Sequence, residues 1–315
     1  MREKILEILE PGGFVSGEVL AEKLNVSRTS IWKQIRVLRN FGYEIESVKN
    51  KGYHLVSRPD IPIFEEVSKD LNTNIIGREI RYFKTIDSTN IFAKKLINDR
   101  VQEGFVVVAD IQEKGRGRKD RSWSSPSGGL WFSVVLYPNI PSQSAMLITM
   151  AFSVSIVQAI ENVTGLNSGI KWPNDLLIDN KKVCGVLTEL DAEIDRVNYA
   201  VVGVGLNVNN KLERGLGKSA LTLSKKFGRD VSRVNLFRVI LEKLDENYSK
   251  LKSGDYDYIR NLWFSYANII GKKVEVTREN DTITGTVSNV DETGSLIIKT
   301  SGGDVRILTG DVKLL

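Results

Sequence analysis

The chain has 315 residues, enough for two or three domains of roughly 100 to 200 residues each. Its 41% hydrophobic and 26% charged residues are typical of globular proteins and exclude collagen-like and wholly disordered chains. One cysteine and one histidine exclude a disulfide framework, an iron–sulfur cluster and any metal site built from His or Cys, whereas a net charge of +5 permits a polyanionic partner.

The first 60 residues predict three short helices and a β-hairpin. Ser16 and Ser27 occupy N-cap positions, so the second and third helices begin there. Two alternating stretches, 43–48 and 52–56, are joined by a short polar turn and predict a hairpin. Helices joined by a tight turn and followed by a hairpin indicate a winged helix-turn-helix domain at residues 1–60.

The third helix carries basic and polar side chains, and no acid interrupts residues 27–40. Its exposed face should be positive, and Arg and Gln have donor and acceptor geometry that suits base edges in a major groove. We predict DNA contacts from Arg28, Thr29, Ser30, Lys33, Gln34 and Arg36. The alternatives are a solvated cationic face or a domain that only regulates the rest of the chain.

Strands alternate with helices from residue 61 to residue 268, and this predicts a mixed sheet within an α+β domain. The longest predicted helix covers 142–164. Short strands separated by Gly, Asp and Asn turns follow from 269 to 315 and predict a small β-barrel. With no run of about 18 apolar residues and no secretory signal, we expect a soluble, cytoplasmic, multidomain protein without membrane contact.

Five basic side chains and two glycines occur within the eight residues 114–121. Glycines let backbone N–H groups approach an anion closely, and arginines offer paired donors to a carboxylate or phosphate. Trp123 follows and can stack on a base. No Gly-Lys-Ser/Thr follows, so this is not the phosphate loop of NTPases. By itself the stretch is equally compatible with a nucleic-acid contact or a solvated turn.

Three further stretches carry polar groups. Residues 88–90 open a helix and can hydrogen-bond a polar head group, or merely cap the helix. Residues 171–175 set a cation, an amide and a carboxylate close together, with Lys182 and Gly185 soon after. On the strand that includes residues 203–207, two glycines let a ligand approach the backbone.

These four stretches, in this order and between a helix-turn-helix and a small barrel, resemble the biotin–protein ligases that also repress the biotin operon. The resemblance covers essentially the whole chain. It implies a central sheet like that of class II aminoacyl-tRNA synthetases and an SH3-like C-terminal barrel. It also implies ATP and Mg²⁺ as cofactors, with biotinyl-5′-AMP as intermediate and corepressor. The implied partners are a biotin carboxyl carrier protein domain with an acceptor lysine, operator DNA, and a second copy of the chain once the adenylate is bound.

The resemblance assigns residues to three roles. Biotin is expected at Ser88, Thr89, Asn90, Gln112, Gly115, Arg116, Gly117, Arg118, Lys182, Gly185, Gly203 and Gly205. ATP and the adenylate are expected at Arg116, Arg118, Arg121, Trp123, Asn174 and Asn207, with Mg²⁺ near Asn174. The catalytic group is expected to be Arg118, Lys182, Lys171 and Asp175, where Asp175 orients or deprotonates the acceptor amine.

Three alternatives remain at this stage. The first is a ligase whose N-terminal domain does not bind DNA. The second is a ligand-sensing transcription factor with a dead catalytic domain, against which Lys171, Lys182, Arg118 and Asn174 argue because they are intact. The third is a lipoate–protein ligase, which shares the catalytic fold.

Overall fold

The computed structural model describes residues 1–10, 12–267, 269–278 and 281–315. The chain forms two compact units, Met1–Ile61 and Pro62–Leu315. The boundary expected at residue 268, between the central and C-terminal regions, lies outside the described residues.

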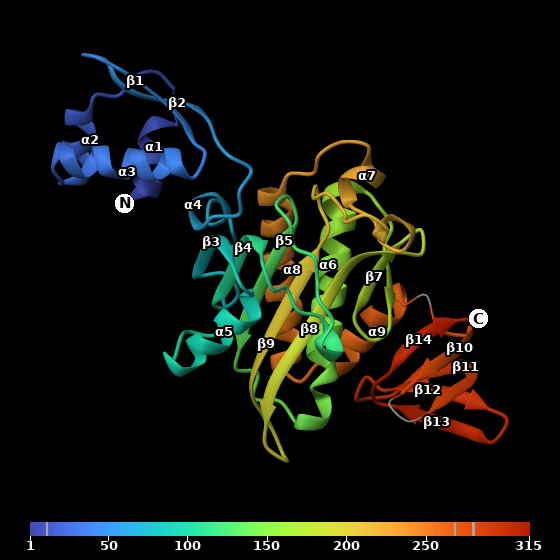
Figure 1. The fold of residues 1–315 in the computed structure, drawn as a ribbon. Coiled ribbons are helices and arrows are strands. Elements are labelled where there is room, and N and C mark those ends of the chain that lie inside the picture. Colours follow the sequence, from blue (N-terminus) through green and yellow to red (C-terminus); the bar gives the residue numbers. More distant parts are fainter. Residues whose placement is uncertain (11, 268, 279–280) are drawn as a thin grey trace. The chain divides into compact units, whose positions relative to one another are not determined.

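The first unit contains three helices and a two-stranded hairpin (Figure 1): α1 (Arg2–Leu9), α2 (Gly17–Leu24), α3 (Arg28–Asn40), β1 (Glu44–Val48) and β2 (Gly52–Ser57). The Oγ atoms of Ser16 and Ser27 accept hydrogen bonds from Val19 N and Ser30 N, each at 3.1 Å, so both serines cap their helices as predicted. The predicted winged helix-turn-helix architecture is confirmed.

The second unit is built on a mixed sheet of seven strands. In chain order they are β3 (Ile80–Ile86), β4 (Val106–Gln112), β5 (Leu130–Leu136), β6 (Gly169–Lys171), β7 (Asp175–Ile178), β8 (Lys181–Ala192) and β9 (Val197–Leu206). They lie in the order β3-β4-β5-β9-β8-β7-β6. Only β3 and β4 are parallel neighbours, and every other pair is antiparallel. Every residue of β5 is buried, which places this strand at the centre of the core.

Helices cover the two faces of this sheet unequally (Figure 1). The helices α6 (Met146–Thr164), α8 (Arg233–Lys252) and α9 (Tyr256–Tyr266) share one apolar core with the sheet, whereas α5 (Thr89–Asn98) packs on the opposite face against β4, β5 and β9. Because side chains alternate along a strand, Gly185 and Gly203 face the side of α5 while Val186 and Val204 belong to the large core. The part of this face beyond α5 is where a ligand can reach the sheet.

Shorter elements complete the second unit. They are α4 (Phe64–Val67), α7 (Leu223–Phe227) and the 3₁₀ turns η1 (Arg118–Asp120), η2 (Ser142–Ser144) and η3 (Leu216–Lys218). The predicted helix over 142–164 thus begins as η2 and continues as α6. This segment is long and apolar enough to cross a membrane, with a mean hydropathy of 1.5, but 78% of its most apolar window is buried inside the protein. It is therefore a core helix.

The C-terminal region forms a five-stranded antiparallel sheet, in the order β13-β12-β11-β10-β14, called here the C-terminal β domain. Its strands are β10 (Lys273–Thr277), β11 (Thr282–Val290), β12 (Leu296–Thr300), β13 (Gly303–Ile307) and β14 (Asp311–Leu314). The structure therefore confirms the predicted fold class, in which a helix-turn-helix precedes a mixed sheet and a small β domain.

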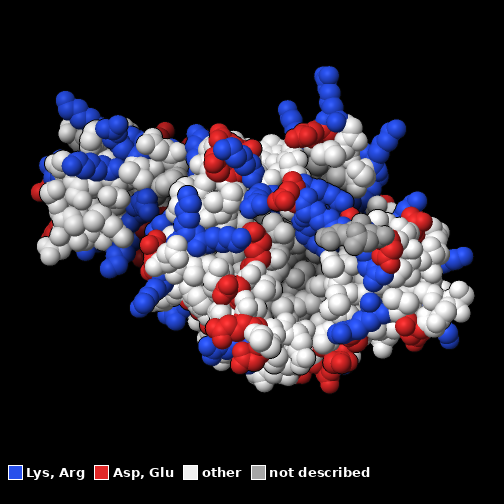
Figure 2. Space-filling view, turned by 60° about the horizontal axis from the view of Figure 1, so that its bottom comes forward, with Lys and Arg blue, Asp and Glu red and all other residues white. Residues whose placement is uncertain are grey.

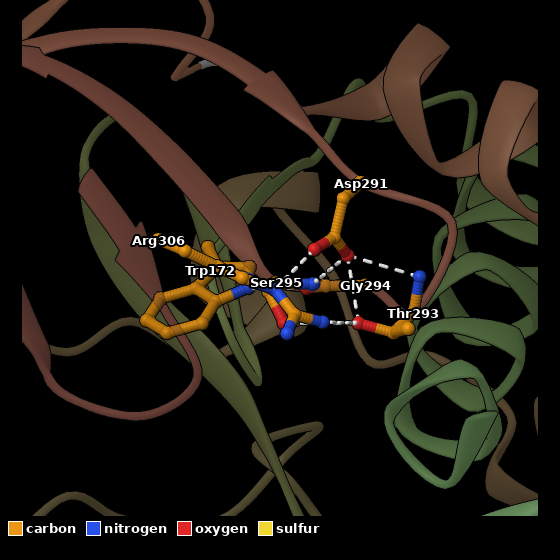
Figure 3. A network of polar contacts seen from close by, with 6 residues as sticks. All are labelled: Trp172, Asp291, Thr293, Gly294, Ser295 and Arg306. Carbon is orange, nitrogen blue, oxygen red and sulfur yellow. Dashed lines mark hydrogen bonds and ion pairs between the residues drawn. The ribbon is translucent and has the colours of Figure 1, made fainter. Parts of the chain in front are cut away.

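The turn between β11 and β12 joins this domain to the central sheet (Figure 3). The Asp291 carboxylate accepts hydrogen bonds from the backbone N–H groups of Thr293 and Ser295, both at 2.9 Å, and it pairs with Arg306 at 2.5 Å. The turn so fixed presents the Gly294 carbonyl, which accepts from Trp172 Nε1 at 3.1 Å. A residue of the predicted 171–175 stretch is thereby anchored to the C-terminal β domain.

Candidate functional site

A cavity of about 150 Å³ opens on the sheet face beside α5. Its walls come from the start of α5, the end of β4, the loop that contains η1, strands β7, β8 and β9, and the start of β14. The predicted site residues that line it are Ser88, Thr89, Asn90, Gln112, Arg116, Gly117, Arg118, Arg121, Trp123, Asn174, Asp175, Lys182, Gly185, Gly203 and Gly205. Predicted residues up to 117 positions apart in sequence thus meet in one place.

One end of the cavity is lined by buried, neutral hydrogen-bonding groups. Ser88, Thr89 and Asn90 are 2%, 3% and 4% exposed, although all three are polar. The Gln112 Oε1 accepts from Thr89 N at 2.8 Å and lies 3.0 Å from Thr89 Oγ1. Ser133 Oγ lies 2.7 Å from Thr89 Oγ1 and 2.5 Å from Asn90 Oδ1. This end, called here the head-group end, suits a polar but uncharged ligand group.

Glycines on β9 allow side chains to lie flat on the sheet. A Cβ at Gly203 would come within 2.0 Å of Asn90 Oδ1, and one at Gly205 within 2.4 Å of Trp123 Nε1. The sequence predicted that these glycines admit a ligand. In the structure, the space that these glycines leave is filled by the Asn90 amide and the Trp123 indole. These two side chains line the cavity, so a ligand would contact them.

The other end of the cavity, called here the cationic end, contains Lys182 and Arg118. Lys182 Nζ lies 2.7 Å from Asp175 Oδ1 and 4.9 Å from the centre of the Trp123 ring, so it pairs with a carboxylate and with an aromatic face. Arg118 Nη1 donates to Asn174 Oδ1 at 3.2 Å, and Asn174 Nδ2 donates to Val186 O at 2.8 Å. The cations therefore converge where a ligand carboxylate or phosphate would be neutralised.

The crowded charges of the loop 114–121 are largely compensated by nearby acids. Lys114 pairs with Asp87 at 3.2 Å and Arg116 with Asp120 at 3.0 Å, while Asp311 pairs with Arg121 at 2.7 Å and with Lys119 at 3.5 Å. Among the described residues, Arg118 has no carboxylate within ion-pair distance. Burial lowers the pKa of its guanidinium below the usual value, against the opposing influence of Asp311 and Asp175. Arg118 is thus the loop cation that an anionic ligand can neutralise.

The C-terminal β domain contributes two groups that the sequence did not predict. Arg118 Nη2 donates to Thr309 Oγ1 at 2.9 Å, and Asp311 lines the cavity. The C-terminal β domain therefore binds three cations of the loop: Arg118, Lys119 and Arg121. On the face drawn in Figure 2 the second unit is hollowed, and Lys and Arg side chains gather along one rim of the hollow.

The structure places three predicted site residues outside this cavity. Lys171 lines a separate hollow of about 590 Å³ beside Glu161 and Asp179. Asn207 is 4% exposed, and its Oδ1 accepts from Asn210 Nδ2 at 3.0 Å within the core. Gly115 is buried within the loop, where a Cβ would come within 2.3 Å of Trp123 O, so this glycine permits the close turn of the loop.

In the first unit, the predicted DNA-contact residues all lie within residues 28–36 of α3. Arg28, Thr29, Lys33 and Arg36 are exposed, while Ser30 and Gln34 are partly buried. The sequence did not single out Trp32, which is 47% exposed and has the Arg36 guanidinium 4.8 Å from its ring centre. Arg39, the last basic residue of α3, donates to Ile45 O at 3.0 Å and so braces the hairpin.

Comparison with known proteins agrees with these two units. Three family models match the chain: HTH domain at residues 1–54, Biotin/lipoate A/B protein ligase family at 82–207, and Biotin protein ligase C terminal domain at 269–315. The bifunctional ligase/repressor BirA of Bacillus subtilis (strain 168) is 37% identical over 320 aligned residues, which cover 100% of this chain and 98% of that protein. The chain belongs to the bifunctional biotin ligase/repressor family.

Other members of the biotin ligase/repressor family give the same result. The bifunctional ligase/repressor BirA of Escherichia coli (strain K12) is 26% identical, covering 99% of this chain and 96% of that protein. Among solved structures, the biotin protein ligase from Aquifex aeolicus in complex with biotin and ATP superposes with a TM-score of 0.66 at 32% identity. That match covers 76% of this chain and 99% of the Aquifex chain.

Proposed function

We propose that this protein is an ATP-dependent biotin–protein ligase that also binds operator DNA as a repressor. The observation that supports the ligase most strongly is the two-ended cavity. Its head-group end is neutral, buried and polar, and its cationic end holds Arg118 and Lys182. Biotin has the matching asymmetry, with a neutral ureido group at one end and a carboxylate at the other.

The first step requires positioning and charge neutralisation more than proton transfer. The biotin carboxylate is ionised at neutral pH, so one of its oxygens attacks the α-phosphorus of ATP, the bond to the β-phosphate oxygen breaks, and pyrophosphate leaves. Both reactants are anionic, and Arg118 and Lys182 lower their repulsion in the reacting complex. Trp123 offers an aromatic face at this end, on which we place the adenine ring.

The second step transfers biotin to a lysine of a biotin carboxyl carrier domain. The uncharged amine attacks the carbonyl carbon of biotinyl-AMP, an amide bond forms, and AMP leaves with the electrons of the carbon–oxygen bond. Asp175 lines the cavity and pairs with Lys182 at 2.7 Å. In this proposal Asp175 orients the incoming amine and accepts its proton.

Lipoate is the competing substrate, since the matched family model covers both ligases. The head-group end favours biotin. A dithiolane ring makes no strong hydrogen bonds, so it would leave unused the remaining hydrogen-bonding capacity of the buried Thr89 and Asn90 and of the partly buried Gln112. The ureido N–H and C=O groups can use that capacity.

Mg²⁺ enters this proposal as the ion bound to ATP. Among the described residues, no group of three or more His, Cys, Asp and Glu side chains is placed to hold a metal ion. Asp175 and Asp311 do line the cavity, each paired with a cation. One or two such carboxylates, together with the substrate phosphates and water, form the usual Mg²⁺ environment. Asp175 and Asp311 would thus hold the ion near Asn174, and it would neutralise charge on the phosphates.

Repression follows from the exposed basic side chains on α3 and from the hairpin beside it. A single winged helix has few base contacts, so a homodimer on two half-sites is the expected binding form. We propose that biotinyl-AMP favours this dimer and that transfer to the acceptor removes the ligand and releases DNA. ATP, an acceptor domain and DNA are all available in the cytoplasm, where we place the protein. A gel shift with DNA from upstream of the gene that encodes this chain separates a ligase that is also a repressor from a ligase that does not bind DNA.

Mass spectrometry tests the ligase. The protein is incubated with ATP, Mg²⁺, a carrier domain, and equal concentrations of biotin and lipoate. We expect biotinyl-AMP and a biotinylated lysine. Lipoylation of the carrier, or no acyl adenylate of either kind, would contradict the proposal.

A further inference from the structure

A continuous chain of hydrogen-bonding groups runs behind the head-group end of the cavity. It begins at Lys94, whose Nζ donates to Glu189 Oε1 at 2.6 Å, and Glu189 Oε2 accepts from Asn90 Nδ2 at 2.9 Å. From Asn90 the chain continues through Ser133 to Thr89. Lys94 lies one helical turn after Asn90 on α5, so both face the same residue of β8.

The proton positions in this chain follow from the kind of group at each place. Glu189 can only accept when ionised, so the amide of Asn90 must turn its Nδ2 toward Glu189 and its Oδ1 toward Ser133. Ser133 then has to donate its one hydrogen to Asn90. The Thr89 hydroxyl hydrogen is in turn directed to Ser133 at 2.7 Å or to Gln112 Oε1 at 3.0 Å. In either case Thr89 meets a ligand as an acceptor.

Glu189 is well placed to fix the donor and acceptor roles in this chain, because it is ionised. Burial alone would raise its pKa, but hydrogen bonds from Lys94 and Asn90, together with the charges of Lys94 and Arg116, outweigh burial, and the pKa lies below its usual value. Its side chain is 21% exposed, so water competes little for its oxygens. The carboxylate is therefore ionised at neutral pH.

We propose that Glu189 and Lys94 are positioning residues for head-group recognition, because they fix the Asn90 amide and so keep Thr89 as an acceptor for a ligand N–H. This inference rests on the proposed function, in which the ligand is biotin and the donor is a ureido N–H. Neither residue lines the cavity, so both act through Asn90.

The substitution Glu189→Gln tests the proposal without changing the size of the side chain. Lys94 has only donors, so it draws the oxygen of the new amide, whose NH₂ group then faces Asn90 and turns the Asn90 amide over. Ser133 then accepts from Asn90 and donates its hydrogen to Thr89 Oγ1, where it competes with a ligand N–H for that oxygen. We expect KM for biotin to rise roughly 10- to 100-fold, as for loss of a hydrogen bond to a charged group. The KM for ATP and kcat should stay near wild type.

Two further variants separate positioning from a merely structural role. Glu103→Gln is a matched control, because Glu103 also pairs with a lysine, Lys252, at 2.6 Å and is 20% exposed. Lys94→Met added to Glu189→Gln should recover much of the loss, since the amide oxygen can then turn back to Asn90. A structural defect would instead deepen when the second partner is removed.

The readouts are KM and kcat for adenylation and calorimetric binding of biotin and of desthiobiotin, which keeps the ureido group. Absence of biotin-dependent adenylation in the wild type would refute the proposed function itself. With an active wild type, the inference is overturned if Glu189→Gln binds both ligands as tightly as Glu103→Gln does. It is also overturned if kcat falls while KM for biotin is unchanged.

Discussion

Gly294 provides the sharpest test of how the C-terminal β domain is attached. Its φ is +89°, and a Cβ there would come within 2.7 Å of Met146 Cγ and 3.1 Å of Met150 Sδ. Gly294→Ala therefore suffers two penalties. A left-handed backbone costs an L residue about 1–2 kcal/mol, and overpacking against α6 adds about 1–3 kcal/mol.

Gly271→Ala is the matched control, because it has the backbone penalty without the overpacking. The difference between the two variants therefore isolates the overpacking penalty. Gly271 lies in the same region with a φ of +76°, and a Cβ there would have nothing within 4 Å. Gly271→Ala should therefore lose only the stability that the left-handed backbone costs. Urea unfolding followed by tryptophan fluorescence should thus show Gly294→Ala less stable than Gly271→Ala by about 1–3 kcal/mol.

Adenylation should respond in the same order. The carbonyl of Gly294 holds Trp172, which lies two and three residues before Asn174 and Asp175 in the cavity. We expect Gly294→Ala to lower the adenylation rate more than Gly271→Ala does. Equal stability and equal rates in the two variants would refute the argument that this turn packs against α6 and supports the site.

Three further outcomes are expected. Arg118→Ala should lower the adenylation rate about 10²- to 10³-fold. Lys119→Ala should stay within a few-fold, because its partner Asp311 keeps the closer ion pair with Arg121, and equal losses in the two variants would contradict the site. Operator affinity, measured by gel shift at several salt concentrations, should fall steeply as salt rises. Arg36→Ala should bind the operator more weakly than wild type does. An affinity that does not change with salt would argue against phosphate contacts. Burial raises the pKa of Asp311, but Arg121 and Lys119 lower it by more, so its folded-state pKa lies below the usual 3.8. The stability it contributes is present above the unfolded-state value and is lost as pH falls through the folded-state value, so the stability gap between wild type and Asp311→Asn should be constant above about pH 5 and shrink as pH falls below about 4.

Local patterns in the sequence predicted the architecture. Capping serines, alternating strands and turn residues act over a few positions, so the helix-turn-helix, the hairpin and the strands of the C-terminal β domain could be inferred without tertiary information. The loop 114–121 was also evident, because its density of charge and glycine is unusual.

Contacts between distant segments could not be predicted in the same way. Ser133 and Glu189 join Asn90 from strands 43 and 99 residues away, and nothing local marks either residue as part of a site. Asp311 likewise comes from the last strand of the chain. Asn207 lies in the core because its side chain pairs with Asn210. The glycines that precede Asn207 in the chain do not indicate this pairing.

Biotin-dependent exchange of labelled pyrophosphate into ATP tests the central claim most directly, because it reports the first step alone and needs no acceptor protein. The account predicts exchange with biotin and Mg²⁺, little exchange with lipoate, and a drop of about 10²- to 10³-fold in Arg118→Ala. Exchange that is equally fast with lipoate, or that survives unchanged in Arg118→Ala, would contradict it.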